Sequence, residues 1–209
     1  MNRQSALISA ALLCLSLSAA AESDPVEAIA IDDSVGDHSQ VEWSQAYQQW
    51  VASFPRDAGP LGDASGALCA TRQSGAVWFL AGSEATAPVT RKCSIPAGKS
   101  LFVPIASTVE RLGGKASDCA ALAQLAHETI AQKVSEPTLE VDGQPVEGLA
   151  LHRLATGACF RLGPPDAPQA VADGYYVMLR PLEPGAHTVV FGAKFGGATQ
   201  STTYRLDVH

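Results

Sequence analysis

The residues that could carry out chemistry do not assemble into a standard catalytic motif. A serine-hydrolase nucleophile elbow has the pattern Gly-x-Ser-x-Gly, and neither residues 62–66 nor residues 73–75 match it. A zinc protease needs His-Glu-x-x-His, because one helical turn then brings two imidazoles onto one ion. His127-Glu128 begins this motif, but Ala131 occupies the place of the second histidine. We therefore interpret His127 as an exposed helical residue and predict no catalytic residue and no metal ligand.

Carboxylate pairs are harder to find in a sequence, because the two acids of a glycosidase can come from distant strands. Asp57 and Asp63 lie in a glycine-rich loop, and Asp173 precedes the last strands. A structural role competes with a catalytic one: the only asparagine is Asn2, so aspartates must supply the short polar residues of turns. A secreted hydrolase acting on envelope glycan or peptide through the loop acids is therefore the alternative to a binding protein.

Four residues are the candidate ligand-binding residues: Gln73, Trp78, Arg91 and Lys99. A ligand with an anionic group and an apolar or sugar face could use such a cluster. The structural alternative is that Lys99 caps a turn, Arg91 pairs with an acid and Trp78 belongs to the core. The ligand stays open between a small molecule, a glycan and a protein, and no cofactor is predicted.

Residues 1–21 have the layout of a secretory signal peptide. A basic start with Arg3 is followed by an apolar run over residues 6–19 and by the small residues 19–21. The run is shorter than the roughly 18 residues that span a bilayer. The sequence therefore predicts an exported protein, periplasmic or secreted, whose mature chain begins at Glu22 and has no transmembrane segment.

Export changes how the cysteines are interpreted. Cys14 is removed with the signal peptide, which leaves an even number in an oxidising compartment and predicts two disulfides. No pair has the Cys-x-x-Cys spacing of a zinc or redox site. Three pairings are possible. We favour Cys69 with Cys93 and Cys119 with Cys159, because the first two flank one candidate strand.

The formal net charge of -7 makes a nucleic-acid partner unfavourable, since neutralising phosphates needs a basic face. Residues 22–42 hold many acids and no Lys or Arg, with few large apolar side chains. This composition is typical of a flexible acidic leader. A calcium-binding segment is the alternative, but Asp32, Asp33 and Asp37 lack the glycine and closing Glu of a calcium loop. A single folded domain is expected over residues 43–209.

Two segments have the periodicity of amphipathic helices. An apolar stripe at helical spacing predicts a helix near 44–54 that ends before Pro55; its members are Trp43, Ala46, Tyr47, Trp50, Val51 and Phe54. The aromatic stripe could line a sugar platform, although such spacing is more typical of a core face. A second stripe predicts a helix near 117–135 that carries Cys119 on its buried face.

The rest of the domain has the pattern of short strands separated by Gly and Pro. Strands are expected at 76–82, 89–95, 100–105, 139–141, 145–146, 149–154, 158–162, 175–182, 187–191 and 202–208. Many short strands and only two helices favour a sandwich over a parallel βαβ fold. The predicted fold is mainly β: an antiparallel β-sandwich, immunoglobulin-like or jelly-roll-like, with two packed α-helices.

Two blocks resemble a family of uncharacterised exported bacterial proteins. Residues 73–82 read Gln-Ser-Gly-Ala-Val-Trp-Phe-Leu-Ala-Gly, and residues 96–104 read Pro-Ala-Gly-Lys-Ser-Leu-Phe-Val-Pro. Ala76 stands where that family usually has Pro. The resemblance implies secretion and a shared fold but no reaction. With the missing catalytic motifs, it favours a noncatalytic binding or interaction module of the cell envelope.

Overall fold

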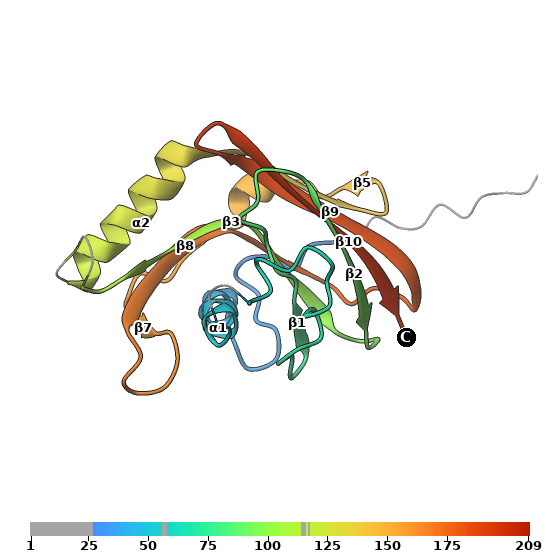
Figure 1. Cartoon of the computed structure of the whole chain (residues 1–209), viewed down its shortest axis with the longest axis horizontal. Coiled ribbons are helices and arrows are strands. Elements are labelled where there is room, and N and C mark those ends of the chain that lie inside the picture. Colours follow the sequence, from blue (N-terminus) through green and yellow to red (C-terminus); the bar gives the residue numbers. More distant parts are fainter. Residues whose placement is uncertain (1–26, 56–57, 114–115, 117) are drawn as a thin grey trace, which may run out of the picture.

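The chain forms two packed β-sheets and two α-helices (Figure 1). The computed structural model describes residues 27–55, 58–113, 116 and 118–209. This architecture confirms the predicted mainly-β sandwich with two helices. The signal-peptide prediction over residues 1–21 lies outside the described residues.

Each sheet has five strands. The first contains β1 (Val77–Phe79), β3 (Ser100–Arg111), β8 (Gln169–Leu179) and β6 (Arg153–Ala155) in that order, with β7 (Phe160–Arg161) also paired to β8. The second has the order β2 (Val89–Ile95), β10 (Ala198–Val208), β9 (Gly185–Phe195), β4 (Val134–Val141) and β5 (Gln144–Pro145). The helices are α1 (Gln40–Ala52), α2 (Cys119–Lys133) and the 3-10 helix η1 (Leu149–Leu151).

The sheets are mixed rather than wholly antiparallel. β1 pairs with β3 in parallel, and β2 pairs with β10 in parallel, while the other pairs are antiparallel. The reason is the path of the chain: it leaves the first sheet after β1, forms β2 in the second sheet, and then returns to lay β3 beside β1 in the same direction.

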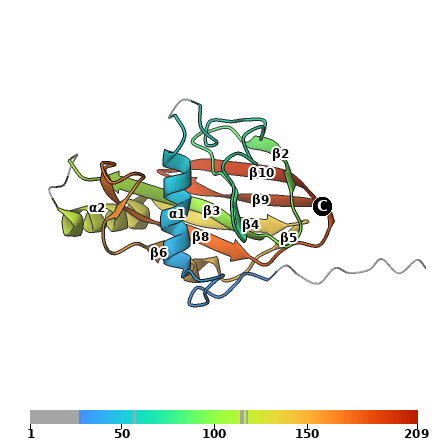
Figure 2. The ribbon, with the colours of Figure 1, turned by 90° about the horizontal axis from the view of Figure 1, so that it is seen from below.

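The long strands β3 and β8 are shared by separate cores on their two faces. Leu101 and Val177 face the second sheet, whereas Phe102 and Tyr176 face α1. This alternation follows from the two-residue period of a strand. Figure 2 shows α1 lying across the first sheet. The aromatic stripe of α1 forms core here, since Tyr47 and Trp50 are buried among these rings.

Helix α2 covers the part of β3 and β8 that extends beyond the second sheet (Figure 1). Its buried residues Leu122 and Ala126 pack against Val171 of β8. The helix begins at an N-cap, Asp118, whose side chain accepts a hydrogen bond from the backbone of Ala121 at 2.9 Å. No helix among the described residues is long and apolar enough to cross a membrane.

The sequence predicted a flexible leader over residues 22–42. The structure corrects this prediction for residues 27–42, which contact the folded domain. Ile29 is only 9% exposed, and its N–H donates to the Met178 carbonyl of β8 at 2.7 Å. α1 begins at Gln40, earlier than expected, because Ser39 and Glu42 form a capping box. Apolar residues spaced among the acids attach this segment to the first sheet. The prediction missed them because it was based on the number of acidic residues in the segment.

Candidate functional site

Two of the predicted binding residues, Gln73 and Lys99, use their polar atoms to stabilise a turn and do not line an open site. The Nε2 of Gln73 donates to the carbonyls of Cys69 at 2.9 Å and Phe79 at 2.8 Å, and its Oε1 accepts from the Phe79 N–H at 3.0 Å. Lys99 donates to the Gly75 carbonyl. The polar atoms of Gln73 are thus used to close the edge of β1.

Arg91 is only 1% exposed, and backbone carbonyls take the place of the expected acid partner. Its guanidinium donates to the carbonyls of Asp63 at 2.5 Å and Leu61 at 3.0 Å, and to the Tyr204 hydroxyl at 3.1 Å. Trp78 is buried in the core between the sheets. The four predicted residues therefore do not converge on a cleft, and Arg91 has no accessible surface to offer a ligand.

The loop acids proposed for a hydrolase have a structural role where they are described. The Asp63 carboxylate accepts hydrogen bonds from the N–H groups of Ser65 at 2.9 Å, Gly66 at 3.1 Å and Leu68 at 2.8 Å. Burial works against the charged form, but these hydrogen bonds outweigh it and lower the pKa of Asp63. Asp57 lies outside the described residues.

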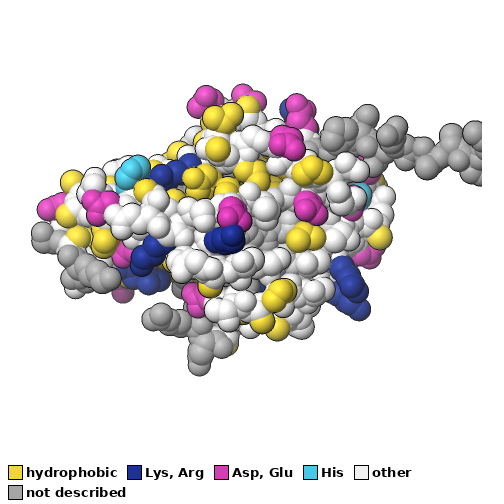
Figure 3. Space-filling view, turned by 90° about the horizontal axis from the view of Figure 1, so that it is seen from above, with side chains coloured by type: hydrophobic (Ala, Val, Ile, Leu, Met, Phe, Trp, Pro, Cys, Tyr) yellow, Lys and Arg dark blue, Asp and Glu magenta, His cyan; other side chains and the backbone are white. Residues whose placement is uncertain are grey.

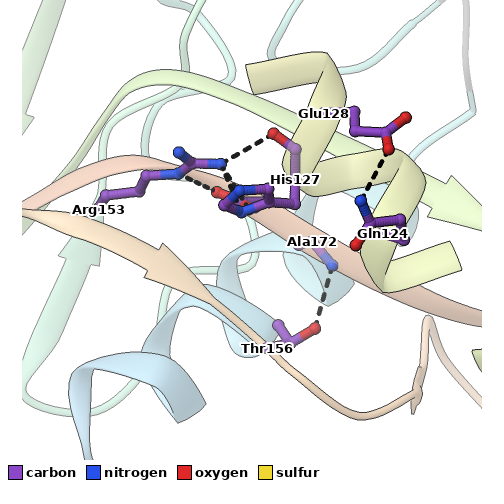
Figure 4. Close-up of polar contacts among 7 residues, drawn as sticks. Gln124, His127, Glu128, Arg153, Thr156 and Ala172 are labelled. Atoms are coloured by element: carbon purple, nitrogen blue, oxygen red, sulfur yellow. Dashed lines mark hydrogen bonds and ion pairs between the residues drawn. The ribbon is translucent and has the colours of Figure 1, made fainter. Parts of the chain in front are cut away.

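The structure instead brings together three residues that are far apart in the sequence. Asp173, on β8, is 1% exposed. Arg153, on β6, donates from Nε to Asp173 Oδ1 at 2.8 Å and from Nη2 to Asp173 Oδ2 at 3.0 Å. The same Nη2 lies 3.0 Å from the His127 carbonyl and 3.1 Å from His127 Nδ1, so it also links to α2 (Figure 4). The hydrogen bond to Asp173 raises the pKa of Arg153.

These contacts favour one tautomer of the neutral His127 ring. Arg153 Nη2 can only donate, and its two hydrogens also serve Asp173 Oδ2 and the His127 carbonyl, so a neutral His127 ring fits best when Nδ1 shares one of these donors and Nε2 carries the proton. Asp173 Oδ2 lies further from Nδ1, at 3.7 Å. The His127 side chain is 59% exposed. It therefore presents an N–H donor to solvent, whereas a general base would need a free lone pair there.

Beside this cluster lies a hollow of about 370 Å³ between α2, β8 and residues 155–157. Its walls consist largely of the small residues Ala120, Ala123, Ala126, Ala155, Gly157 and Ala172. Its polar lining comes from Gln124, His127 and Asp173. Figure 3 shows a histidine and basic side chains lying next to apolar surface on this side of the molecule. The hollow exists because the side chains between the helix and the strands are too short to fill the space there.

Two links hold α2 beside β6 and the segment that follows it. Cys119, the first residue of α2, forms a disulfide with Cys159. About two helical turns later, His127 contacts Arg153. The hollow lies between these two links. The structure also pairs Cys69 with Cys93, so both predicted disulfides are confirmed.

Sequence reasoning considered His127 and Asp173 separately and missed Arg153. The two-residue strand period and the helical stripe indicate which face a residue occupies. Neither indicates that β6 pairs beside β8, with Ala155 opposite Asp173 and Arg153 opposite Tyr175.

A second hollow of about 320 Å³ lies between the β4–β5 hairpin and η1. Pro137, Pro145 and Leu149 are among its lining residues, and Glu140 and Glu147 contribute carboxylates. None of its lining residues takes part in a buried ion pair among the described residues. The α2 hollow is therefore the better candidate site.

Comparisons with known proteins identify no relative. No family model matches the sequence, and no curated protein matches it. Among solved structures, a chain of the complex described as "Structure of PbICP-C in complex with falcipain-2" is similar to 65% of this chain and to 100% of that chain. The sequences are 11% identical and the TM-score is 0.29, a likeness that carries no argument about fold or function.

Proposed function

We propose that this protein is an exported, noncatalytic binding module whose ligand occupies the hollow beside α2. The observation that carries the proposal is the hollow itself, held between a disulfide at Cys119–Cys159 and the ion pair between Arg153 and the buried Asp173. Concave sites with few, well-placed polar groups are the usual place for ligands. A disulfide and a bidentate ion pair preorganise such a site and so reduce the entropy lost on binding.

The chemistry of the lining supports binding rather than conversion. The residues that line the hollow include no serine, threonine, cysteine, tyrosine or lysine that could act as a nucleophile. His127 offers a donor instead of a base, for the reason given above. No described geometry supports the hydrolase alternative through loop acids, since Asp63 uses its carboxylate within its own turn.

The lining also restricts the ligand. Asp173 neutralises Arg153, so the hollow has no uncompensated cation that would attract an anion. No phenylalanine, tyrosine or tryptophan lines it, so a stacked sugar ring lacks its usual platform there. The ligand is therefore a small apolar group with a hydrogen-bond acceptor that receives the Nε2–H of His127.

The exported part of the proposal is supported by the two disulfides and by the signal-like residues 1–21. Disulfides persist in oxidising compartments such as the periplasm or the extracellular space. Fractionation of the native host tests this part directly: the protein is expected in the exported fraction, shortened to begin at Glu22. A chain that stays in the cytosol with Met1 attached contradicts it.

The binding site is tested by a fragment screen on the disulfide-bonded protein, followed by two-dimensional NMR. Hits are expected to shift the amide signals of residues 120–127 and 171–173. Ala123→Leu fills the hollow from the helix and should weaken the hits about tenfold or more, because overpacking a site costs at least about 1–3 kcal/mol.

The matched control is Ala121→Leu, an exposed position of the same helix that does not line the hollow. This variant should bind the hits as the unmodified protein does. Hits that shift other regions, or that ignore Ala123→Leu, overturn the proposed site.

A further inference from the structure

We propose that the ligand of the α2 hollow is an extended peptide segment of a partner protein that adds as a strand to the outer edge of β6. This inference rests on the proposed binding function and names the chemical class of its ligand. The added segment supplies main-chain hydrogen bonds to β6 and places a small aliphatic side chain in the hollow.

The first argument is the unpaired edge of β6, the terminal strand of its sheet. The His152 carbonyl accepts from Tyr176 N–H at 3.0 Å, and Thr156 N–H donates to the Ala172 carbonyl at 2.9 Å. In an antiparallel ladder, alternate residues point their main-chain groups to the same side. The N–H and C=O groups of Arg153 and Ala155 therefore point away from β8, and no described residue bonds to them.

The second argument is that the other sheet edges are protected. Gln73 caps β1. The loop around Ser65 covers β2, where Lys92 N–H donates to the Ser65 carbonyl at 3.0 Å. Gly66 approaches Lys92 so closely that a Cβ would lie 2.3 Å from its carbonyl oxygen. These are the devices by which proteins prevent strand addition.

The edge of the second sheet at β4 and β5 is blocked as well. Pro137 and Pro145 remove N–H groups from these strands, and Glu136, with φ of 52°, interrupts the register between Ser135 and Thr138. On β7, the Arg161 carbonyl already accepts a hydrogen bond from Gln49 Nε2 of α1 at 2.8 Å. Among the described strands, β6 thus keeps two outward residues, Arg153 and Ala155, that are not proline and whose main-chain groups bond to no described residue.

The third argument is the position of the hollow relative to this edge. Ala155 belongs both to the edge and to the lining of the hollow. Side chains of an added strand alternate between the two faces of the sheet. Every second side chain therefore lies on the α2 side, beside walls of Ala and Gly, while the carbonyl groups of the segment are acceptors for His127. Only a peptide backbone offers donors and acceptors in the alternation that this edge requires.

The lining determines the character of the segment. Because the Arg153 charge is neutralised by Asp173 and the walls are small, a short uncharged aliphatic side chain fits the hollow best. A glycan or a lipid chain does not offer the alternating donors and acceptors that the free N–H and C=O groups of Arg153 and Ala155 require. These ligand classes are therefore outcomes of the test rather than part of the proposal.

The test begins with a phage-displayed library of random heptapeptides, selected on the disulfide-bonded protein. The enriched peptide is synthesised, and its affinity is measured by calorimetry. A series of single N-methylated peptides is then bound to the unmodified protein. Strand addition predicts an alternating pattern: N-methylation of either of the two residues, one apart, whose N–H groups face the Arg153 and Ala155 carbonyls weakens binding about tenfold, and N-methylation of the residue between them has little effect.

The protein side of the test uses Ala155→Pro and its control Ala155→Ser. Proline removes the outward N–H without touching the hydrogen bonds to β8, a position where edge strands tolerate it. Ala155→Pro should weaken the peptide about tenfold, whereas Ala155→Ser, which keeps the N–H, should not. The N-methyl series does not depend on the folding of any variant.

The outcomes separate this inference from the proposed function. Peptides weakened by Ala123→Leu but indifferent to Ala155→Pro and to alternating N-methylation overturn strand addition and leave the binding site in place. Selection of no peptide, while small glycan or acyl fragments occupy the hollow, overturns the peptide class alone. Ligands that ignore both Ala123→Leu and Ala155→Pro overturn both proposals.

Discussion

At the scale of single residues, the buried Arg91 and the partly exposed Arg153 satisfy their guanidinium groups in opposite ways. Arg91 is satisfied by backbone carbonyls and the Tyr204 hydroxyl, with no carboxylate within ion-pair distance among the described residues. Arg153 is satisfied by the carboxylate of Asp173 and by α2. Arg91 therefore holds a loop to the sheets, whereas Arg153 holds a helix beside a hollow.

Asp173→Asn tests how much the buried pair contributes to stability. The variant leaves the Arg153 guanidinium without its counter-charge, and we expect the free energy of unfolding to fall by about 1–3 kcal/mol, less than for a fully buried pair because the Arg153 side chain is 24% exposed. Urea denaturation measures the change. The control is Glu136→Gln, which breaks an exposed pair with Lys194 and should cost less than about 1 kcal/mol. Equal effects of the two substitutions would show that the buried pair has no special role.

At the scale of elements, a histidine joins the turn after β4 to the segment before β9. The Nδ1 of His187 lies 2.7 Å from Asp142 Oδ2, and its Nε2 lies 2.8 Å from the Glu183 carbonyl oxygen. Burial disfavours the charged ring, but these two acceptors outweigh it and raise the pKa of His187. Both nitrogens face acceptors, so the protonated ring is the form that fits.

This arrangement predicts a pH-dependent contribution to stability. Because the pKa is higher in the folded than in the unfolded chain, the contribution of His187 is fully present below about pH 6.5 and is lost as the pH rises through the folded value. The difference in free energy of unfolding between the unmodified protein and His187→Gln should therefore shrink as the pH is raised from about 6.

Denaturation series at several pH values check this expectation. Burial lowers the pKa of His152, which contributes with the opposite sign, but it is present in both proteins and cancels in the difference. A difference that stays constant or grows with pH would contradict the assigned role of His187.

Several elements could not be read from local sequence. Proline is usually confined to strand ends and edges, yet Pro104 lies inside the central strand β3, where a bulge between Pro104 and Ala106 accommodates it. The strand expected to stop at Ile105 continues to Arg111, because α2 provides a second surface for β3 to pack against. Tertiary contacts set these lengths.

At the scale of the whole molecule, the acidic N-terminal segment is part of the folded body over its described residues. Gln40 donates to the Ile29 carbonyl at 3.2 Å, and Ala28 forms a β-bridge with Leu179. The acids Asp32, Asp33 and Asp37 remain exposed. The segment therefore combines an anchored apolar side with a solvated acidic side.

Ile29→Ala tests this anchoring. Removing a buried aliphatic side chain should lower the free energy of unfolding by about 2 kcal/mol or more. Asp32→Ala, an exposed neighbour, should change it by less than about 0.5 kcal/mol. Thermal and urea unfolding measure both variants, and an unchanged stability of Ile29→Ala would mean that the folded domain begins later.

The sequence by itself determined the features that depend on local periodicity and composition: a mainly-β sandwich, two amphipathic helices and an even number of cysteines for two disulfides, whose pairing it favoured but left open. Only the tertiary structure decided the candidate site. Asp173, Arg153 and His127 come from three elements, and their meeting depends on which strand lies beside β8 and which helix lies over it. A strand's two-residue period specifies the face of a side chain, but its neighbours follow from long-range pairing, which leaves no local pattern in the sequence.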